Sequence, residues 1–258
     1  MLQTLTRQWE LPKRRPFMRM TWHDLLFMHW PVDVVSLRKL MPERLEVDTF
    51  EGQAWIAVVP FHMSGVAPVW SPNLPGMSAF PELNVRTYVR DPLDKNNSGK
   101  PGVWFFSLDA TNPVAVRGAR WLFNLNYVDA KIRVKKRSAE NDSQADWVDY
   151  SSRRRNPKLQ AELVMSYRPV GGLLEQQSDL EAWMTSRYCM YSSDRRGRIL
   201  RGEIDHQPWP LQKAECNIGR NTMTDWLGVK LPDLSPMVHF SRSIDVLAWS
   251  MDRIDQVL

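Results

Sequence analysis

Short stretches of alternating apolar and polar residues recur along most of this 258-residue chain, separated by polar or proline-rich connections. Alternation over four to eight residues is typical of β-strands whose two faces meet different surroundings. Many short strands with few helices between them indicate an antiparallel sheet that curls or closes, because closure removes unpaired edges. The predicted strands are Ala54–Pro60, Leu83–Arg90, Val103–Leu108, Tyr127–Lys136, Trp147–Ser152, Gln160–Tyr167, Tyr188–Tyr191, Ile199–His206, Leu211–Asn217 and Ser243–Met251.

Signals for helices are few. Pro31 suits the first position of a helix, where its fixed φ angle and missing N–H group do no harm. Ser178 and Glu181 have the spacing of a capping box, in which each satisfies a backbone N–H group near the other. These and weaker patterns predict helices over Val32–Leu40, Asp109–Leu122, Ser178–Thr185 and Thr222–Leu227.

The composition fits one globular domain of the α+β class. Hydrophobic residues make up 43% of the chain and charged residues 24%, which argues against disorder or a disulfide-rich miniprotein. Neither an internal repeat nor a low-complexity linker divides the sequence. We therefore expect a single domain over residues 1–258, with an N-terminal extension over 1–20 and the barrel over 21–250.

Charge and cysteine content restrict the partners and the location. The formal net charge is only +5, and the basic clusters lie in polar surroundings without a recognisable nucleic-acid-binding module, so a nucleic-acid partner is not expected. Cys189 and Cys216 are too few for a disulfide framework. The sequence has no apolar run long enough to span a membrane and no signal-peptide core. These features predict a cytoplasmic protein.

One predicted strand, ELNVRTYVR over Glu82–Arg90, carries candidate binding residues. Alternation places Arg86 and Tyr88 on its polar face, where a guanidinium fork and a phenol would suit an anionic ligand. That face would line a cavity inside a barrel, or face solvent in an open sheet. The next strand, GVWFFSLD, is apolar until its end, so Asp109 either opens a ligand site there or caps a following helix.

Several motifs together resemble one family and cover the chain from about Thr21 to Trp249. They are HWPVDVVSLRKLMPERLEVDTFEGQAWIAVVPF (His29–Phe61), FPELNVRTYV (Phe80–Val89), GVWFFSLDA (Gly102–Ala110), SRYCMY (Ser186–Tyr191) and HQPWPL (His206–Leu211). This set resembles the YqjF-like family, a domain of unknown function (DUF2071). The family in turn resembles the acetoacetate decarboxylase-like fold, which implies a curled antiparallel β-barrel with a central cavity and a few peripheral helices.

The resemblance also indicates which catalytic residues the chain lacks. In the decarboxylases an arginine and a glutamate precede a lysine that forms a Schiff base with the substrate. Here the arginine corresponds to Arg120, the glutamate to Trp121 and the lysine to Tyr127. A Schiff base requires a primary amine, which tyrosine does not have, so acetoacetate decarboxylation is not expected.

We therefore expect a protein that binds a small anionic or carboxylate-bearing molecule in a barrel cavity. Arg86 and Arg120 would hold the anion beside Asp109 and Trp121, with Tyr88 and Tyr127 as hydrogen-bond donors. His206 is the preferred proton-transfer residue, together with Tyr127, if the protein is an enzyme; a buried structural histidine is the alternative.

The competing hypothesis is a non-catalytic structural or regulatory interaction protein whose barrel is filled by its own side chains, which its 12 tryptophans would allow. No metal motif occurs among the five histidines, and neither a metal nor another cofactor is expected. Whether the protein is an enzyme, and whether it forms a homo-oligomer, stay open at the level of sequence.

Overall fold

Strands make up most of the computed structural model, which describes residues 7, 9–73, 78–94, 99–111, 124–138 and 145–254. The longer strands form one sheet, and short helices connect them. The strands are β1 (Met18–Val32), β2 (Glu46–Val47), β3 (Ala54–Pro68), β4 (Phe80–Arg90), β5 (Gly102–Ala110), β6 (Tyr127–Arg137), β7 (Trp147–Arg154), β8 (Glu162–Leu173), β9 (Cys189–Ser193), β10 (Ile199–Asp205), β11 (Leu211–Asn221), β12 (Met237–Ala248) and β13 (Asp252–Arg253). The helices are α1 (Val34–Arg38), η2 (Pro157–Leu159), α3 (Asp179–Thr185) and η3 (Asp225–Leu227).

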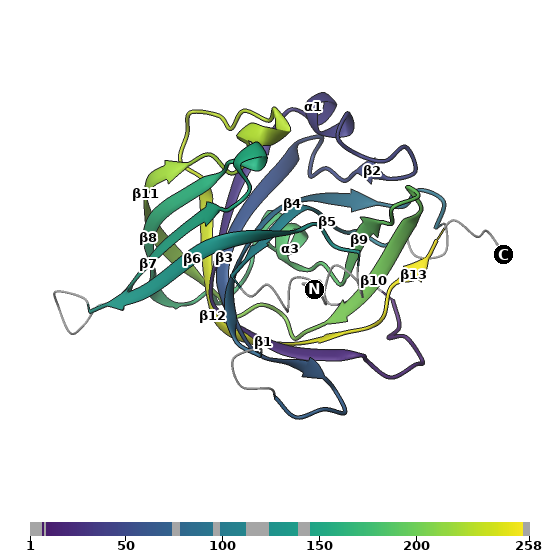
Figure 1. The fold of residues 1–258 in the computed structure, drawn as a ribbon, viewed down its shortest axis with the longest axis horizontal. Coiled ribbons are helices and arrows are strands. Elements are labelled where there is room, and N and C mark those ends of the chain that lie inside the picture. Colours follow the sequence, from purple (N-terminus) through teal and green to yellow (C-terminus); the bar gives the residue numbers. More distant parts are fainter. Residues whose placement is uncertain are drawn as a thin grey trace.

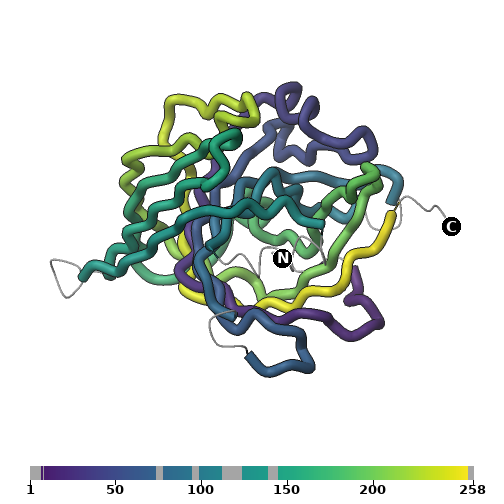
Figure 2. The backbone as a smooth tube through the Cα atoms, viewed as in Figure 1, coloured from purple at the N-terminus to yellow at the C-terminus, as the bar shows by residue number. Residues whose placement is uncertain are grey.

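The sheet closes on itself twice and forms two fused barrels (Figures 1 and 2). One ring of nine strands runs β5, β6, β7, β8, β11, β12, β1, β3 and β4 before returning to β5. A second ring of seven strands runs β10, β9, β5, β4, β3, β1 and β12 before returning to β10. The two rings share β12, β1, β3, β4 and β5. A shared strand has a barrel interior on each side, so long stretches of these strands are buried on both faces.

The predicted closed β-barrel is confirmed, but it is mixed rather than purely antiparallel. Strand β5 pairs in parallel with β6 and with β9, while every other named pair is antiparallel. Parallel neighbours need a long connection, and β5 ends at Ala110 whereas β6 begins at Tyr127, which leaves sixteen residues between them in sequence. Alternation within a strand gives no information about the direction of its neighbour, so the sequence did not predict these two pairings.

Strand β1 is the longest element that the sequence analysis missed. It pairs with β3 and β12 over most of its length, and its second half, from Leu25 to Trp30, is buried on both faces. The alternation of side chains on β1 also shifts by one residue at Asp24, which has a φ of 47°. Before Asp24 the even-numbered Met20 and Trp22 face the seven-strand barrel, and after it the odd-numbered Phe27 does. Continuous apolar sequence with such a change has no regular period of two, so it did not predict a strand.

The two barrels differ in how they are filled. The largest group of buried side chains, which includes Met28, Val58 and Tyr150, comes mostly from strands of the nine-strand ring and extends to Tyr191 of β9 and Ile199 of β10. Two smaller groups, which include Phe27, Phe61 and other side chains, surround the seven-strand barrel. Aromatic side chains therefore act both as the filling of one barrel and as the walls of the other.

The helices confirm some predicted boundaries and correct others. Ser178 and Glu181 form the expected capping box at the start of α3. Helix α1 begins after Asp33, whose carboxylate accepts from the Ser36 N–H, so Pro31 belongs to β1 instead. The helix expected over Thr222–Leu227 is the short η3, and no described helix is long and apolar enough to cross a membrane.

Close packing between β5 and β9 gives a first testable prediction, at Gly102. A Cβ atom at this position would lie 2.6 Å from the carbonyl oxygen and the Sγ atom of Cys189, and 2.9 Å from the Tyr191 ring. We expect Gly102→Ala to lower the free energy of unfolding by about 1–3 kcal/mol, because the strands must separate. Urea denaturation measures this, with Gly172→Ala as the matched control, since nothing lies within 4 Å of a Cβ atom there. Equal stability of the two variants would contradict the prediction.

Candidate functional site

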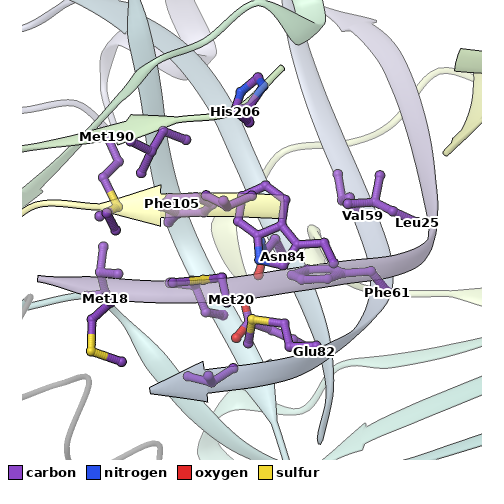
Figure 3. A pocket seen from close by; sticks show the side chains of 18 of the residues that line it. Met18, Met20, Leu25, Val59, Phe61, Glu82, Asn84, Phe105, Met190 and His206 are labelled. Atoms are coloured by element: carbon purple, nitrogen blue, oxygen red, sulfur yellow. The ribbon is translucent and has the colours of Figure 1, made fainter. Parts of the chain in front are cut away.

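A cavity of about 360 Å³ lies inside the seven-strand barrel (Figure 3). Methionine, aromatic and aliphatic side chains form most of its wall, and a small number of polar groups point into it. The side chains that line it are Met18, Met20, Trp22, Leu25, Val59, Phe61, Met63, Val66, Ala67, Pro68, Ser71, Pro72, Ser78, Phe80, Glu82, Asn84, Arg86, Val103, Phe105, Leu108, Leu125, Tyr127, Thr185, Arg187, Met190, Ile204, His206, Trp209, Val246 and Ala248. An apolar concavity with a few converging polar groups is typical of a small-molecule site.

The strand register orders the lining residues along the length of the cavity. On β4, Phe80 lies opposite Met63, and Arg86 lies opposite Ala57, six residues further along. Beyond Met63, β3 continues to Pro68, which lies opposite Met18 of β1. The exposed Pro72 follows shortly after, at the end of the cavity that reaches the surface. Arg86 therefore belongs to the inner part of the cavity, and the methionines of β1 lie toward its mouth.

Arg86 is a buried cation without an anionic partner among the described residues. Its side chain is 8% exposed, and the described part of the chain provides no ion pair for it. Its guanidinium lies 5.3 Å from the ring centre of Phe27 and 5.9 Å from that of Tyr88. The Nε atom is buried and has no hydrogen-bond partner. A buried charge is costly unless it is paired, so this arrangement favours an anionic ligand.

Glu82 lies four residues before Arg86 on the same face of β4. The Tyr127 hydroxyl and the Asn84 side chain both donate hydrogen bonds to its carboxyl group. Burial outweighs these bonds and raises the pKa of Glu82 to about 8, so the group is mostly a neutral carboxylic acid at pH 7. Its Oε2 atom has no partner, and neither has the Oδ1 atom of Asn84. Alternation had placed Glu82 on the face of Arg86, but the sequence analysis did not select it as a site residue.

His206, which directly follows β10, and Tyr127 of β6 line the same cavity. The His206 ring donates from Nδ1 to the Gln207 carbonyl at 2.8 Å and stacks on Tyr188. Burial lowers the pKa of His206, so the imidazole is neutral at pH 7. Burial and the neighbouring Glu82 carboxyl raise the pKa of Tyr127 well above its ordinary value, which keeps the phenol a hydrogen-bond donor.

The structure also brings in a second arginine that the sequence analysis did not assign to the site. Arg187 follows α3, lines the cavity and lies 4.8 Å from the ring centre of Tyr88. Its Nη1 atom donates to the Asp48 carboxylate at 2.5 Å and its Nε atom to the Trp183 carbonyl. The Nη2 atom is buried and unpartnered. Only tertiary folding places Arg187 here, because it comes from a loop about one hundred residues away from Arg86 in sequence.

Tyr88 and Asp109 do not line the cavity. The Tyr88 hydroxyl is 2.5 Å from Nε2 of His29, and the ring packs against Trp183 of α3. The Asp109 carboxylate points to the other side of β5, where it accepts two hydrogen bonds from Arg154.

A β-bulge explains where Asp109 lies. Val85 pairs with Ser107 and Arg86 pairs with Phe105, so Phe106 is an additional residue on β5. After the bulge, Leu108 rather than Ser107 or Asp109 faces the cavity. The predicted ligand residues Arg120 and Trp121, and most of the predicted helix Asp109–Leu122, lie outside the described residues. In the described part of the chain, no group of three or more His, Cys, Asp or Glu side chains is arranged to hold a metal.

The double barrel with its internal cavity has the fold of acetoacetate decarboxylase-like structures. The fold is similar to that of the enduracididine biosynthesis enzyme MppR complexed with pyruvate, with a TM-score of 0.62 at 11% identity over 93% of this chain and 91% of that one. It is also similar to an acetoacetate decarboxylase-like enzyme from Sphingomonas wittichii RW1, with a TM-score of 0.60 at 11% identity over 94% of each chain. For acetoacetate decarboxylase from Legionella pneumophila the TM-score is 0.55 at 13% identity, over 98% of this chain and 97% of that one.

The sequence relationship is closer to proteins without an assigned activity. The chain is 43% identical over 235 residues, 91% of both chains, to the uncharacterized protein YqjF of Bacillus subtilis (strain 168). Residues 19–245 match the DUF2071 family of uncharacterized conserved proteins. The chain belongs to this family, as its motifs predicted.

Proposed function

We propose that this protein binds a small carboxylate-bearing molecule in the cavity of the seven-strand barrel. The observation that carries the proposal is Arg86, a buried guanidinium without an anionic partner among the described residues. Arg187 adds a second guanidinium with an unpartnered Nη2 atom. A carboxylate placed between them would restore the charge balance and accept the free N–H groups.

The neutral groups of the cavity suit a carbonyl or hydroxyl group on the same ligand. The Glu82 carboxylic acid has a free oxygen. The uncharged His206 lines the same cavity and is hydrogen-bonded to the backbone of Gln207 and Arg187, so it would have to release one of these bonds to exchange a proton with a bound molecule. General acid–base chemistry requires groups of this kind within reach of a bound substrate. His206 is the preferred proton-transfer residue, and Tyr127 holds Glu82 in place rather than acting as a base.

Schiff-base chemistry is not part of the proposal. The lining side chains that the structure describes include arginine, histidine and tyrosine but not lysine. Tyr127, at the position that resembles the lysine of the decarboxylases, lies at the cavity wall and has no amine. Pyruvate is bound by the structurally similar MppR, so a 2-oxo acid is a reasonable first probe here. The competing hypothesis, a barrel filled by its own side chains, fits the nine-strand barrel better than the seven-strand barrel, because the latter contains the cavity.

Calorimetric titration with carboxylates tests the proposal. We expect at least one of pyruvate, phenylacetate and hexanoate to bind with one-to-one stoichiometry, and its Kd to rise at least 30-fold in Arg86→Ala, because a desolvated charge pair contributes about 2 kcal/mol or more. Arg90→Ala is the matched control, since Arg90 is an exposed arginine of the same strand that pairs with Glu46. Equal Kd values in the wild type and Arg86→Ala would refute the anion site.

A further inference from the structure

We propose that the ligand is an amphipathic monocarboxylate, bound with its carboxylate at Arg86 and with an elongated apolar body that extends toward Met18 and Met20. The inference rests on the proposed function and adds the chemical class of the ligand. It depends on how the polar and apolar lining groups are distributed along the cavity.

The charged and amide side chains that line the cavity belong to its inner half, whereas the outer half has only the serines Ser71 and Ser78 as polar side chains among the described residues. Arg86 and Asn84 of β4 lie opposite Ala57 and Val59, and Glu82 lies opposite Phe61. Arg187 approaches the same region, since its guanidinium and that of Arg86 both lie within 6 Å of the Tyr88 ring centre. The charged end of a ligand therefore has one favourable location.

The outer half of the cavity offers almost only apolar contacts. Phe80 of β4, two residues nearer the exposed end than Glu82, lies opposite Met63 of β3. On its other edge β3 pairs with β1, where Trp22 lies opposite Met63. Met18 lies opposite Pro68, four residues before Trp22 on β1 and close to the exposed end. A short polar acid bound at Arg86 would leave these surfaces unfilled, whereas an apolar chain would remove them from water.

The dimensions fit a ligand longer than a three-carbon acid. A cavity of about 360 Å³ holds roughly twelve water-sized groups, at about 30 Å³ for each. Phe80 and Arg86 are six residues apart on β4, which corresponds to about 20 Å along a strand. The outer wall contains Met18, Met20 and Met63, and methionine side chains adapt to irregular apolar shapes.

The test is a calorimetric series of straight-chain carboxylates from acetate to decanoate, with 1-octanol as a ligand that has the tail but no carboxylate. Each methylene added between butanoate and octanoate should lower Kd about fourfold, since burial of one CH₂ group contributes about 0.8 kcal/mol. We expect the decrease to stop when the chain exceeds the cavity. Octanol should bind at least tenfold more weakly than octanoate, and Arg86→Ala should remove this preference.

A variant at the mouth locates the tail. Met20→Asp places a charge on the apolar wall and should weaken octanoate at least tenfold while leaving butanoate within about twofold. Met20→Leu, which conserves volume, is the control for changes in packing. The wild-type series tests the ligand class even if Met20→Asp does not fold.

The outcomes separate this inference from the proposed function. If Kd does not depend on chain length but Arg86→Ala still weakens every acid, the anion site stands and the amphipathic ligand is refuted. If Kd falls with chain length but octanol binds as tightly as octanoate in both wild type and Arg86→Ala, the carboxylate site is refuted. Absence of binding across the whole series would refute both.

Discussion

Asp109→Ala is expected to lower the free energy of unfolding by about 3–5 kcal/mol, which would make Asp109 one of the most sensitive positions of the chain. The Asp109 and Arg154 side chains are both 0% exposed, and Nε and Nη2 of Arg154 donate to the two carboxylate oxygens at 2.8 and 3.0 Å. Nη2 also donates to the Ser107 hydroxyl at 2.6 Å, and the guanidinium lies 4.7 Å from the Trp226 ring centre. Removal of the carboxylate leaves a positive charge that has no contact with water.

Urea denaturation of two further variants distinguishes this cause from a general loss of contacts. Asp252→Ala breaks an exposed pair with Arg14, which should cost less than about 1 kcal/mol. The double variant Asp109→Ala with Arg154→Met removes both charges, so it should be more stable than Asp109→Ala alone. If Asp109→Ala were no more destabilising than Asp252→Ala, the buried pair would not have the role that we assign to it.

The second large effect is a dependence of stability on pH that arises from Glu82. Its carboxyl has a pKa of about 8 in the folded protein and an ordinary value of 4.5, so the folded state retains the proton more strongly. The stability that this proton contributes is complete below pH 4.5, decreases as the pH rises from about 4.5 to about 8, and does not change further above that. The total loss is up to about 5 kcal/mol, because each pKa unit corresponds to 1.36 kcal/mol.

Glu82→Gln isolates this contribution. The amide has nearly the same shape, still accepts from Tyr127 and does not titrate, so the variant should become more stable than the wild type as the pH approaches 8. Free energies of unfolding measured in urea at intervals between pH 5 and pH 8.5 give the difference, in which the titration of all other groups largely cancels. A difference that stays constant over this range would contradict the raised pKa.

Particular residues show how far the sequence predicted this site. Strand β4 alternates regularly, so its polar face was predicted correctly, and Glu82, Asn84 and Arg86 do share it. The same alternation included Tyr88, whose contacts with His29 and α3 keep it out of the cavity. The prediction that Asp109 faces the site was wrong, because the additional residue on β5 shifts the alternation and turns the side chains after it to the opposite face of the strand.

The sequence alone determined the strand-rich composition, most strand positions, the capping box of α3 and membership of the family, because these depend on local periodicity and on short motifs. Only the tertiary structure decided that the sheet closes into two barrels, that one is filled and the other contains a cavity, and that Arg187 joins Arg86 there. Those properties depend on strand pairings between distant segments and on the cost of burying charge. In particular, the pairing of β10 with β12 closes the second ring around the cavity.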